Sequence, residues 1–323
     1  MKAIVYTRYG SPDVLQLKEV EKPVPTDDEI LVKIHVASVN RSDWECLIGK
    51  PLYARFGGIF RPSRHILGSD IAGRVETVGI NHKQFQPGDE VYGDILMQLG
   101  AFAEYVCVRG GTLALKPASM TFEEASTIPQ AAVIALRGIR DKGLVQPGQK
   151  VLINGAGGGS GMFAIQLAKL YGAEVTGVDN TGKLEFMRSI GADHVIDYTQ
   201  EDFTRNRKQY DLILDLVAHR SPFACSRALK PNGRYYAVGG SVAILLQILL
   251  LGSWIKRRTG KNIRILAVQP YPQDFMAITE LIEAGKITPV IDKRYPLSEV
   301  PEAIRCVGEG RARGKVVITM RSE

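Results

Sequence analysis

Short alternating stretches of hydrophobic residues occupy the first third of the chain, and turns rich in glycine and proline separate them. Alternation with a period of two is typical of strands that bury one face, so this part is predicted to be β-rich. The predicted strands are Lys2–Tyr6, Leu15–Val20, Ile30–Ser38, Ile71–Val78 and Ala103–Val108. A helix is predicted from Thr121, because this residue is a good N-cap and acidic residues follow it in the first turn.

From residue 150 the pattern changes to apolar strands that alternate with segments of helical character. The strand candidates are Lys150–Asn154, Glu174–Val178, His194–Asp197, Leu212–Leu216, Arg234–Val238 and Asn262–Val268. Helical segments lie between them, for example at Lys183–Ser189 and Pro222–Ala228. Strands joined by helical crossovers predict an α/β fold with a doubly wound parallel sheet of the Rossmann type.

The last part of the chain, from about residue 271, predicts two helices and a final strand at Gly314–Thr319. This strand has no neighbour in sequence with which it can pair, so we expect it to return to the first β-rich domain. The prediction is therefore a discontinuous first domain, residues 1–125 and 271–323, with a nucleotide-binding domain, residues 126–270, inserted into it. We expect the cofactor in the cleft between them, at the carboxyl ends of the parallel strands.

A glycine-rich turn within Val151–Gly161, which reads VLINGAGGGSG, joins the first of these strands to a helical pattern. Such a turn directs backbone N–H groups and the positive end of the helix dipole to one point. Only residues without bulk let a pyrophosphate approach that point closely. We therefore predict that this turn binds a dinucleotide, through Ala156, Gly158, Gly159, Ser160 and Gly161.

Asp179 ends the next predicted strand and lies 21 residues beyond Gly158. A carboxylate at about this distance accepts hydrogen bonds from the ribose hydroxyls of the adenosine. It repels a 2′-phosphate, so the local chemistry of Asp179 favours NADH over NADPH.

Composition supports a two-domain globular protein: 323 residues, of which 45% are hydrophobic and 23% charged. The N-terminal sequence MKAIVYTRYG has no apolar core followed by a cleavage site, so we expect no secretory signal. The four cysteines form no CxxC pair, which favours a reducing compartment and predicts a cytoplasmic protein.

An apolar run at Val242–Leu251 is followed by a basic cluster between Lys256 and Arg264. The run is too short to span a bilayer, so no transmembrane segment is predicted. The apolar run is best explained as a buried helix, a wall of the substrate pocket or a dimer face. The basic cluster is best explained as a solvated face. The alternative is that residues 242–264 make peripheral contact with a membrane or a nucleic acid.

Several longer motifs resemble those of the medium-chain dehydrogenase/reductase superfamily, and within it the zinc-independent branch of quinone oxidoreductases and enone reductases. They include ILVKIHVASVNRSDW, LGSDIAGRVETVG, FQPGDEVYG, GQKVLINGAGGGSGMFAIQLAKLYGAEVTGV and ARGKVVI. The resemblance covers nearly the whole chain. It implies a GroES-like catalytic domain beside a Rossmann domain, usually in a homodimer.

The same resemblance argues against a metal. Zinc-dependent alcohol dehydrogenases of this superfamily have a cysteine at the position of Asn40, a His-Glu pair at Ser69-Asp70 and another cysteine near Gln130. A catalytic zinc needs three Cys, His or carboxylate ligands, which these residues do not supply. The resemblance therefore implies an enzyme without zinc.

Hydride transfer without a metal needs an acceptor that is already electron-poor, such as a quinone or an α,β-unsaturated carbonyl. The resemblance makes Asn40 a candidate to hydrogen-bond the substrate oxygen or the nicotinamide ribose, and Tyr53 a candidate proton donor. The alternatives are a turn residue for Asn40 and a pocket wall for Tyr53. Four further residues match family positions near the nucleotide: Tyr198, Val217, Gly239 and Gly240.

The choice of cofactor stays open between NADPH and NADH. Lys183 matches a lysine that many NADPH-using relatives direct at the 2′-phosphate, whereas Asp179 favours NADH.

Together these features predict an NAD(P)H-dependent oxidoreductase that transfers hydride to quinones or activated C=C bonds. Its expected partners are a small electron-poor acceptor and a second copy of the chain. One alternative is a metal-free reductase or dehydrogenase of aldehydes or ketones. Another is a nucleotide-binding protein of low turnover that residues 242–264 tether to membrane or RNA.

Overall fold

The computed structural model describes residues 1–55, 58–269 and 271–320, and the chain divides into two compact units. The first comprises Met1–Val133, Pro270–Ala284 and Pro289–Glu323, and the second Ile134–Gln269 and Gly285–Thr288. The first unit includes the whole of the helix α2 (Phe122–Ser126), which packs against its sheet, and extends to Val133. Thr288 belongs to the second unit, where its backbone N–H and carbonyl bond to the side chain of Gln166 at 2.8 and 2.9 Å.

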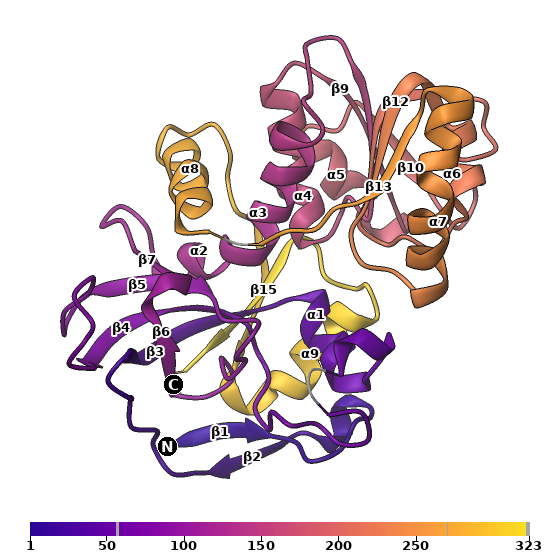
Figure 1. Ribbon diagram of the computed structural model, residues 1–323. Helices are drawn as coiled ribbons and strands as arrows, with labels where there is room; N and C mark the ends of the chain where they lie inside the picture. Colours follow the sequence, from indigo (N-terminus) through magenta and orange to yellow (C-terminus); the bar gives the residue numbers. More distant parts are fainter. Residues whose placement is uncertain (56–57, 270, 321–323) are drawn as a thin grey trace. The chain divides into compact units, whose positions relative to one another are not determined.

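The first unit is built on a mostly antiparallel sheet with the strand order β14-β15-β3-β4-β5-β7, with β6 also paired to β3 (Figure 1). A separate antiparallel pair joins β1 (Lys2–Val5) to β2 (Gln16–Glu19). The sheet strands are β3 (Glu29–Val39), β4 (Asp70–Val78), β5 (Glu90–Asp94), β6 (Tyr105–Arg109), β7 (Leu113–Leu115), β14 (Ile291–Pro296) and β15 (Lys315–Thr319). The predicted return of the last strand is confirmed, because β15 pairs antiparallel to β3.

Helices of the first unit cover this sheet and cap its core. They are α1 (Arg41–Ile48), α2, α8 (Pro272–Glu283) and α9 (Val300–Gly308), while α3 (Pro129–Leu136) spans the boundary at Val133. The expected N-cap is present: the Thr121 side chain accepts a hydrogen bond from the backbone N–H of Glu124 at 3.2 Å. The core combines side chains from far apart in the sequence, such as Ile4, Ile34, Ile71, Ile304 and Ile318.

The second unit contains the predicted parallel sheet, in the strand order β10-β9-β8-β11-β12-β13. The strands are β8 (Lys150–Asn154), β9 (Glu174–Asp179), β10 (His194–Asp197), β11 (Tyr210–Asp215), β12 (Leu229–Ala237) and β13 (Asn262–Ile265). Its helices are α4 (Gly159–Leu170), α5 (Leu184–Ser189), α6 (Pro222–Arg227) and α7 (Val242–Thr259). The strand order reverses between β8 and β11, the point at which doubly wound sheets bind nucleotides.

Three strands have little sequence signal and are additional to those predicted. β7 is only three residues long, β5 contains glycine, and β14 reads IDKRYP, which has few apolar residues. β14 lies at the edge of its sheet, where charged residues and proline are common because they discourage pairing with another chain.

The apolar run forms the first half of α7, and of the alternatives predicted for it, a fully buried helix is wrong for the outward side. Ile248, Gly252 and Ile255 face the sheet, whereas Leu249 is 65% exposed and Leu250 77% exposed. The run is apolar on both faces, so hydropathy alone does not show which residues the sheet covers. Within the residues that the structure describes, no helix combines the length and hydropathy needed to cross a membrane.

Candidate active site

The turn that connects β8 to α4 is made mostly of glycines, which have no side chain. Gly155 has a φ of +83°, and α4 begins at Gly159 with Gly158 as its N-cap. A Cβ atom on Gly161 would lie 2.3 Å from the carbonyl oxygen of Gly155, and one on Gly157 would lie 2.6 Å from Cδ of Lys183. These contacts require glycine, and the turn leaves the first N–H groups of α4 accessible to a pyrophosphate. The residues of the turn therefore fit a dinucleotide.

The other predicted nucleotide residues lie at the same edge of this sheet. β9 ends at Asp179, and Tyr198, Val217 and Gly239-Gly240 follow the ends of β10, β11 and β12. All these strands are parallel, so their carboxyl ends and the glycine turn share one edge. Tyr198 and Val217 are about half exposed, and the backbone N–H of Tyr198 donates to the carbonyl of Asp179 at 3.1 Å. The contact of these residues with a nucleotide remains a prediction.

Asp215, at the end of β11, organises this edge, and our sequence analysis missed it. Its Oδ1 accepts hydrogen bonds from Nδ2 of Asn154 and from the backbone N–H of Ala218, both at 2.8 Å. Its Oδ2 accepts one from the hydroxyl of Tyr235 at 2.9 Å. The buried carboxylate therefore ties together β8, β11 and β12 where the strand order reverses. The available signal was an acid directly after the apolar residues Leu212–Leu214.

Asp179 and Lys183, which argue for opposite cofactors, form an ion pair with each other. Nζ of Lys183 lies 3.4 Å from Oδ1 of Asp179, and both residues are buried, at 5% and 7% exposed. The backbone N–H of Gly157 donates to Oδ2 of Asp179 at 3.0 Å, and that of Asn180 to Oδ1 at 2.9 Å. The carboxylate is thus fixed by two backbone donors, whereas the ammonium is directed at the carboxylate.

In the first unit, the side chain of Asn40 belongs to a buried hydrogen-bond network. Asn40 is the N-cap of α1, and its backbone N–H donates to Oδ2 of Asp43 at 2.7 Å. Its Nδ2 donates to Oγ of Ser69 at 3.2 Å, and its Oδ1 accepts from Nζ of Lys315 at 2.6 Å. Lys315, at the start of β15, is only 1% exposed, and its ammonium lies 3.4 Å from Oδ2 of Asp70. Our sequence analysis did not identify Lys315.

Three buried carboxyl groups surround this ammonium, and burial disfavours their charged forms. Burial raises the pKa of Asp43 to about 7. Burial and the neighbouring charge of Asp70 raise the pKa of Asp94 to about 8. Burial also raises the pKa of Asp70, although the Lys315 ammonium opposes this effect, and burial lowers the pKa of Lys315. The network therefore holds fewer negative charges at neutral pH than its composition suggests.

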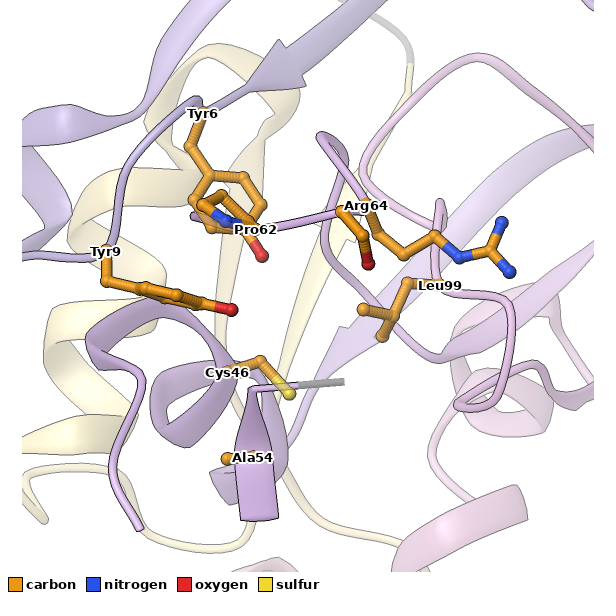
Figure 2. Close-up of a pocket in the computed structure, with 8 residues that line it drawn as sticks. Tyr6, Tyr9, Cys46, Ala54, Pro62, Arg64 and Leu99 are labelled. Carbon is orange, nitrogen blue, oxygen red and sulfur yellow. The ribbon is translucent and has the colours of Figure 1, made fainter. Parts of the chain in front are cut away.

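Tyr53, the second catalytic candidate, lies in the short 3-10 helix Leu52–Ala54 and is 44% exposed. A small cavity in the same unit is bounded by Tyr6, Tyr9, Cys46 and neighbouring residues, and Figure 2 shows the guanidinium of Arg64 directed away from the tyrosine rings. Its volume of about 10 Å³ is at the lower limit for one water molecule, so it does not hold an organic acceptor. Burial raises the pKa of Cys46 to about 12, so this thiol is not a nucleophile at neutral pH.

Known families and proteins match this architecture. The family described as "Alcohol dehydrogenase GroES-like domain" matches residues 26–118, and "Zinc-binding dehydrogenase" matches residues 190–318. The chain is 36% identical to 2-methylene-furan-3-one reductase of Solanum lycopersicum, over 98% of this chain and 79% of that protein. It is 33% identical to the mitochondrial NAD(P)H oxidoreductase RTN4IP1 of Homo sapiens, over 99% and 89%. The quinone oxidoreductase of Coxiella burnetii superposes with a TM-score of 0.89 at 28% identity, covering 99% of both chains.

A GroES-like unit and a Rossmann unit with a dinucleotide turn define an oxidoreductase that uses a nicotinamide cofactor. The chain belongs to the medium-chain dehydrogenase/reductase superfamily, in its quinone oxidoreductase and enone reductase branch.

One of the family descriptions implies zinc, and the residues at the corresponding positions do not fit it. Asn40 offers an amide oxygen that already accepts from Lys315, and Ser69 offers a neutral hydroxyl. The single carboxylate, that of Asp70, lies beside the same ammonium. In the described parts of the chain, no group of three or more His, Cys, Asp or Glu residues is placed to hold a metal ion. A zinc ion here would have to displace a buried cation from a weak set of ligands.

Proposed function

We propose that this protein reduces quinones or activated C=C bonds with a nicotinamide cofactor and without zinc. The observation that carries the proposal is the Lys315–Asn40–Asp70 network at the positions where zinc-dependent relatives hold their metal. The glycine turn and the residues at the carboxyl edge of the parallel sheet support dinucleotide binding. The names of relatives, a furanone reductase and a quinone oxidoreductase among them, agree with this substrate class.

When bound, the nicotinamide supplies the hydride. We assign the stabilising hydrogen bond to Asn40. Its Nδ2 carries two hydrogens, and only one of them is needed for the bond to Ser69. The bond from Lys315 fixes the amide so that Oδ1 faces the ammonium, while Nδ2 faces Ser69 and the carboxyl of Asp70. An acceptor oxygen would therefore take the second Nδ2 hydrogen in place of Asp70. A neutral amide stabilises developing negative charge less than a metal ion does, so the acceptor must itself be electron-poor.

Turnover assays with three acceptor classes test this proposal: 9,10-phenanthrenequinone, 2-cyclohexenone and cyclohexanone, each with NADH and NADPH. We expect turnover of the quinone or the enone and none of the saturated ketone. Activity on the saturated ketone alone would refute the assignment. We expect Asn40→Ala to lower kcat at least tenfold. The variant Tyr53→Phe should lower kcat if the Tyr53 hydroxyl is the proton donor, and leave kcat unchanged if the residue is a pocket wall.

We further propose that NADH is the preferred cofactor. The Asp179 carboxylate is held by the N–H groups of Gly157 and Asn180, so it cannot move away from a 2′-phosphate. Lys183 is already neutralised by Asp179 and must leave that pair to bind a phosphate. Fluorescence titration with both cofactors tests this. We expect tighter binding of NADH, and loss of the preference in Asp179→Ala. Tighter binding of NADPH by the unmodified chain would show that Lys183 dominates.

The resemblance suggests a homodimer and the cysteine pattern a cytoplasmic location, and we include both in the proposal. β13 is an edge strand of the parallel sheet, so a second copy can extend that sheet by strand pairing. The four cysteines are free thiols, as a reducing compartment requires. Light scattering gives the mass in solution, and a monomeric mass at micromolar concentration would remove the dimer from the proposal.

A further inference from the structure

The outward face of α7 exposes large apolar side chains along most of its length. At 100° per residue, Val242, Leu246, Leu249 and Leu250 fall on one side of the helix, opposite Ile248 and Ile255. All four are at least 42% exposed. Trp254 extends this face by one turn, is 50% exposed, and meets the half-exposed ring of Phe223 edge-on at 6.1 Å between centroids. The result is a continuous apolar surface, here called the α7 face.

Basic side chains border the α7 face at its carboxyl end. Lys256, Arg257 and Arg258 occupy the exposed last turn of the helix, and the Arg258 guanidinium lies 5.9 Å from the Trp254 ring centre. The chain contains no acidic residue at all between Asp215 and Asp274, a stretch that includes the whole of α6, α7 and β13. This stretch of the chain therefore carries a net positive charge.

A basic hollow lies close to the end of α7. Nζ of Lys261, just after the helix, donates to the carbonyl of Ser226 at 2.8 Å, which brings this end next to Arg227. Arg227 lines a hollow of about 430 Å³ together with Thr204, Arg205, Arg207, Lys208 and Gln209. These segments directly precede β11, β12 and β13, so the hollow and the basic turn belong to the amino edge of the parallel sheet. The glycine turn and Asp179 lie at the opposite, carboxyl edge.

We propose that the α7 face is a docking surface for an anionic phospholipid bilayer. The leucines and Trp254 would enter the interfacial region, as apolar and aromatic side chains of membrane-surface helices do. The basic turn and the hollow would then meet the lipid phosphates. The hollow and the nucleotide residues occupy opposite edges of the sheet, so the basic end of this surface lies away from the glycine turn.

A second copy of the chain fits this surface less well than a bilayer. An isologous contact between two α7 helices places two basic helices together, and α7 offers no carboxylate to pair with Lys256, Arg257 or Arg258. In an antiparallel arrangement, these cations would also approach the positive N-terminal end of the other helix. An anionic bilayer supplies both the apolar medium and the opposite charge.

Co-sedimentation of the full chain with vesicles tests the proposal. One set contains 30 mol% phosphatidylserine in phosphatidylcholine, and the other is pure phosphatidylcholine. We expect partitioning only into the anionic vesicles, and weaker partitioning at 500 mM than at 50 mM salt. The triple variant Lys256→Gln/Arg257→Gln/Arg258→Gln should bind about 100-fold more weakly, from roughly fivefold per lost charge.

The apolar part is tested separately by Leu249→Gln/Leu250→Gln, which we expect to weaken binding at least tenfold at unchanged charge. Matched controls change exposed residues elsewhere: Lys18→Gln/Lys83→Gln/Arg109→Gln for the charges, and Ile80→Gln/Met97→Gln for the apolar pair. The controls should bind within twofold of the unmodified chain. Thermal unfolding followed by circular dichroism verifies that each variant is folded.

Three results would overturn the proposal. The first is no partitioning into the phosphatidylserine vesicles. The second is an oligomer that Leu249→Gln/Leu250→Gln dissociates, which would assign the α7 face to a second copy. The third is binding that the charge variant abolishes, the leucine variant leaves intact and RNA fully competes, which would assign the basic surface to a nucleic acid. None of these readouts depends on turnover, so the outcome is independent of the proposed reaction.

Discussion

Among the described residues, the ammonium of Lys315 is the only buried cation that we find within hydrogen-bond reach of Asn40 and Asp70. Replacing Lys315 with methionine tests how much this cation contributes to the stability of the fold. Methionine keeps most of the side-chain volume and removes the charge. Asp70 would then be a fully buried carboxylate with the Asp43 and Asp94 carboxyls as neighbours and no counter-charge. Breaking a buried ion pair in this way costs about 3–5 kcal/mol. We expect Lys315→Met to lower the free energy of unfolding at pH 8 by that amount.

The cost of Lys315→Met should depend on pH, and its sign follows from Asp70. Burial raises the pKa of Asp70, and loss of the ammonium raises it further. At pH 5 the carboxyl can therefore escape the penalty by taking up a proton. Urea unfolding of both proteins should show a smaller difference in the free energy of unfolding at pH 5 than at pH 8. Because the total stability of a domain is about 5–15 kcal/mol, the variant should still fold.

The matched second substitution is Asp70→Asn. Asparagine retains an oxygen that can accept the hydrogen bond of Ser38, now 3.2 Å from Oδ2, and it removes the charge that Lys315 neutralises. The double variant Lys315→Met/Asp70→Asn should recover at least 1 kcal/mol of the loss relative to Lys315→Met. The reasoning is refuted if Lys315→Met costs less than 1 kcal/mol at pH 8, or if the double variant is less stable than the single one.

Further predictions concern the acids, the packing and the glycine turn. Burial raises the pKa of Asp43 to about 7 and that of Asp94 to about 8, well above the value near 4 of unfolded carboxyls. Folding therefore takes up protons between about pH 4 and 8. The free energy of unfolding measured in urea should fall as pH rises through this window, and it should fall less steeply in the variant Asp94→Asn. A Cβ atom on Gly308 would lie 2.0 Å from the Trp44 ring, so Gly308→Ala should lower the free energy of unfolding by about 1–3 kcal/mol. In the control Gly111→Ala, the new Cβ atom lies in open space and should lower it by less. In Gly161→Ala the new Cβ atom would push against the backbone carbonyls of Gly155 and Ala156, so NADH binding in fluorescence titration should weaken at least tenfold. The control Gly111→Ala should bind NADH as the unmodified chain does.

The parallel sheet could be predicted because short strand-like segments, such as the apolar cores of β8 and β11, alternate with segments of helical character. The glycine turn and Asp179 are consecutive landmarks of one βαβ unit, so their spacing in sequence determines their place in space. The final strand could be assigned to the first domain by elimination, and the structure pairs it there with β3. β14 could not be predicted, because its residues are mostly polar and β15, its only neighbour in the sheet order, follows later in the chain.

The candidate site shows a different limit, because its chemistry depends on pairs that are distant in sequence. Lys315 is 275 residues from the Asn40 oxygen that it bonds, and only the antiparallel register of β15 on β3 brings them together. Asp179 and Lys183 are four residues apart, yet the sequence shows two opposing charges and not that each neutralises the other. For the apolar run at 242–251 the sequence leaves a buried helix, a pocket wall and a dimer face open, because hydropathy counts residues without their direction. One face of α7 packs against β13, so closely that a Cβ on Gly252 would lie 2.5 Å from the carbonyl of Ile263. Because this face contacts the sheet, the leucines of the opposite face point outward.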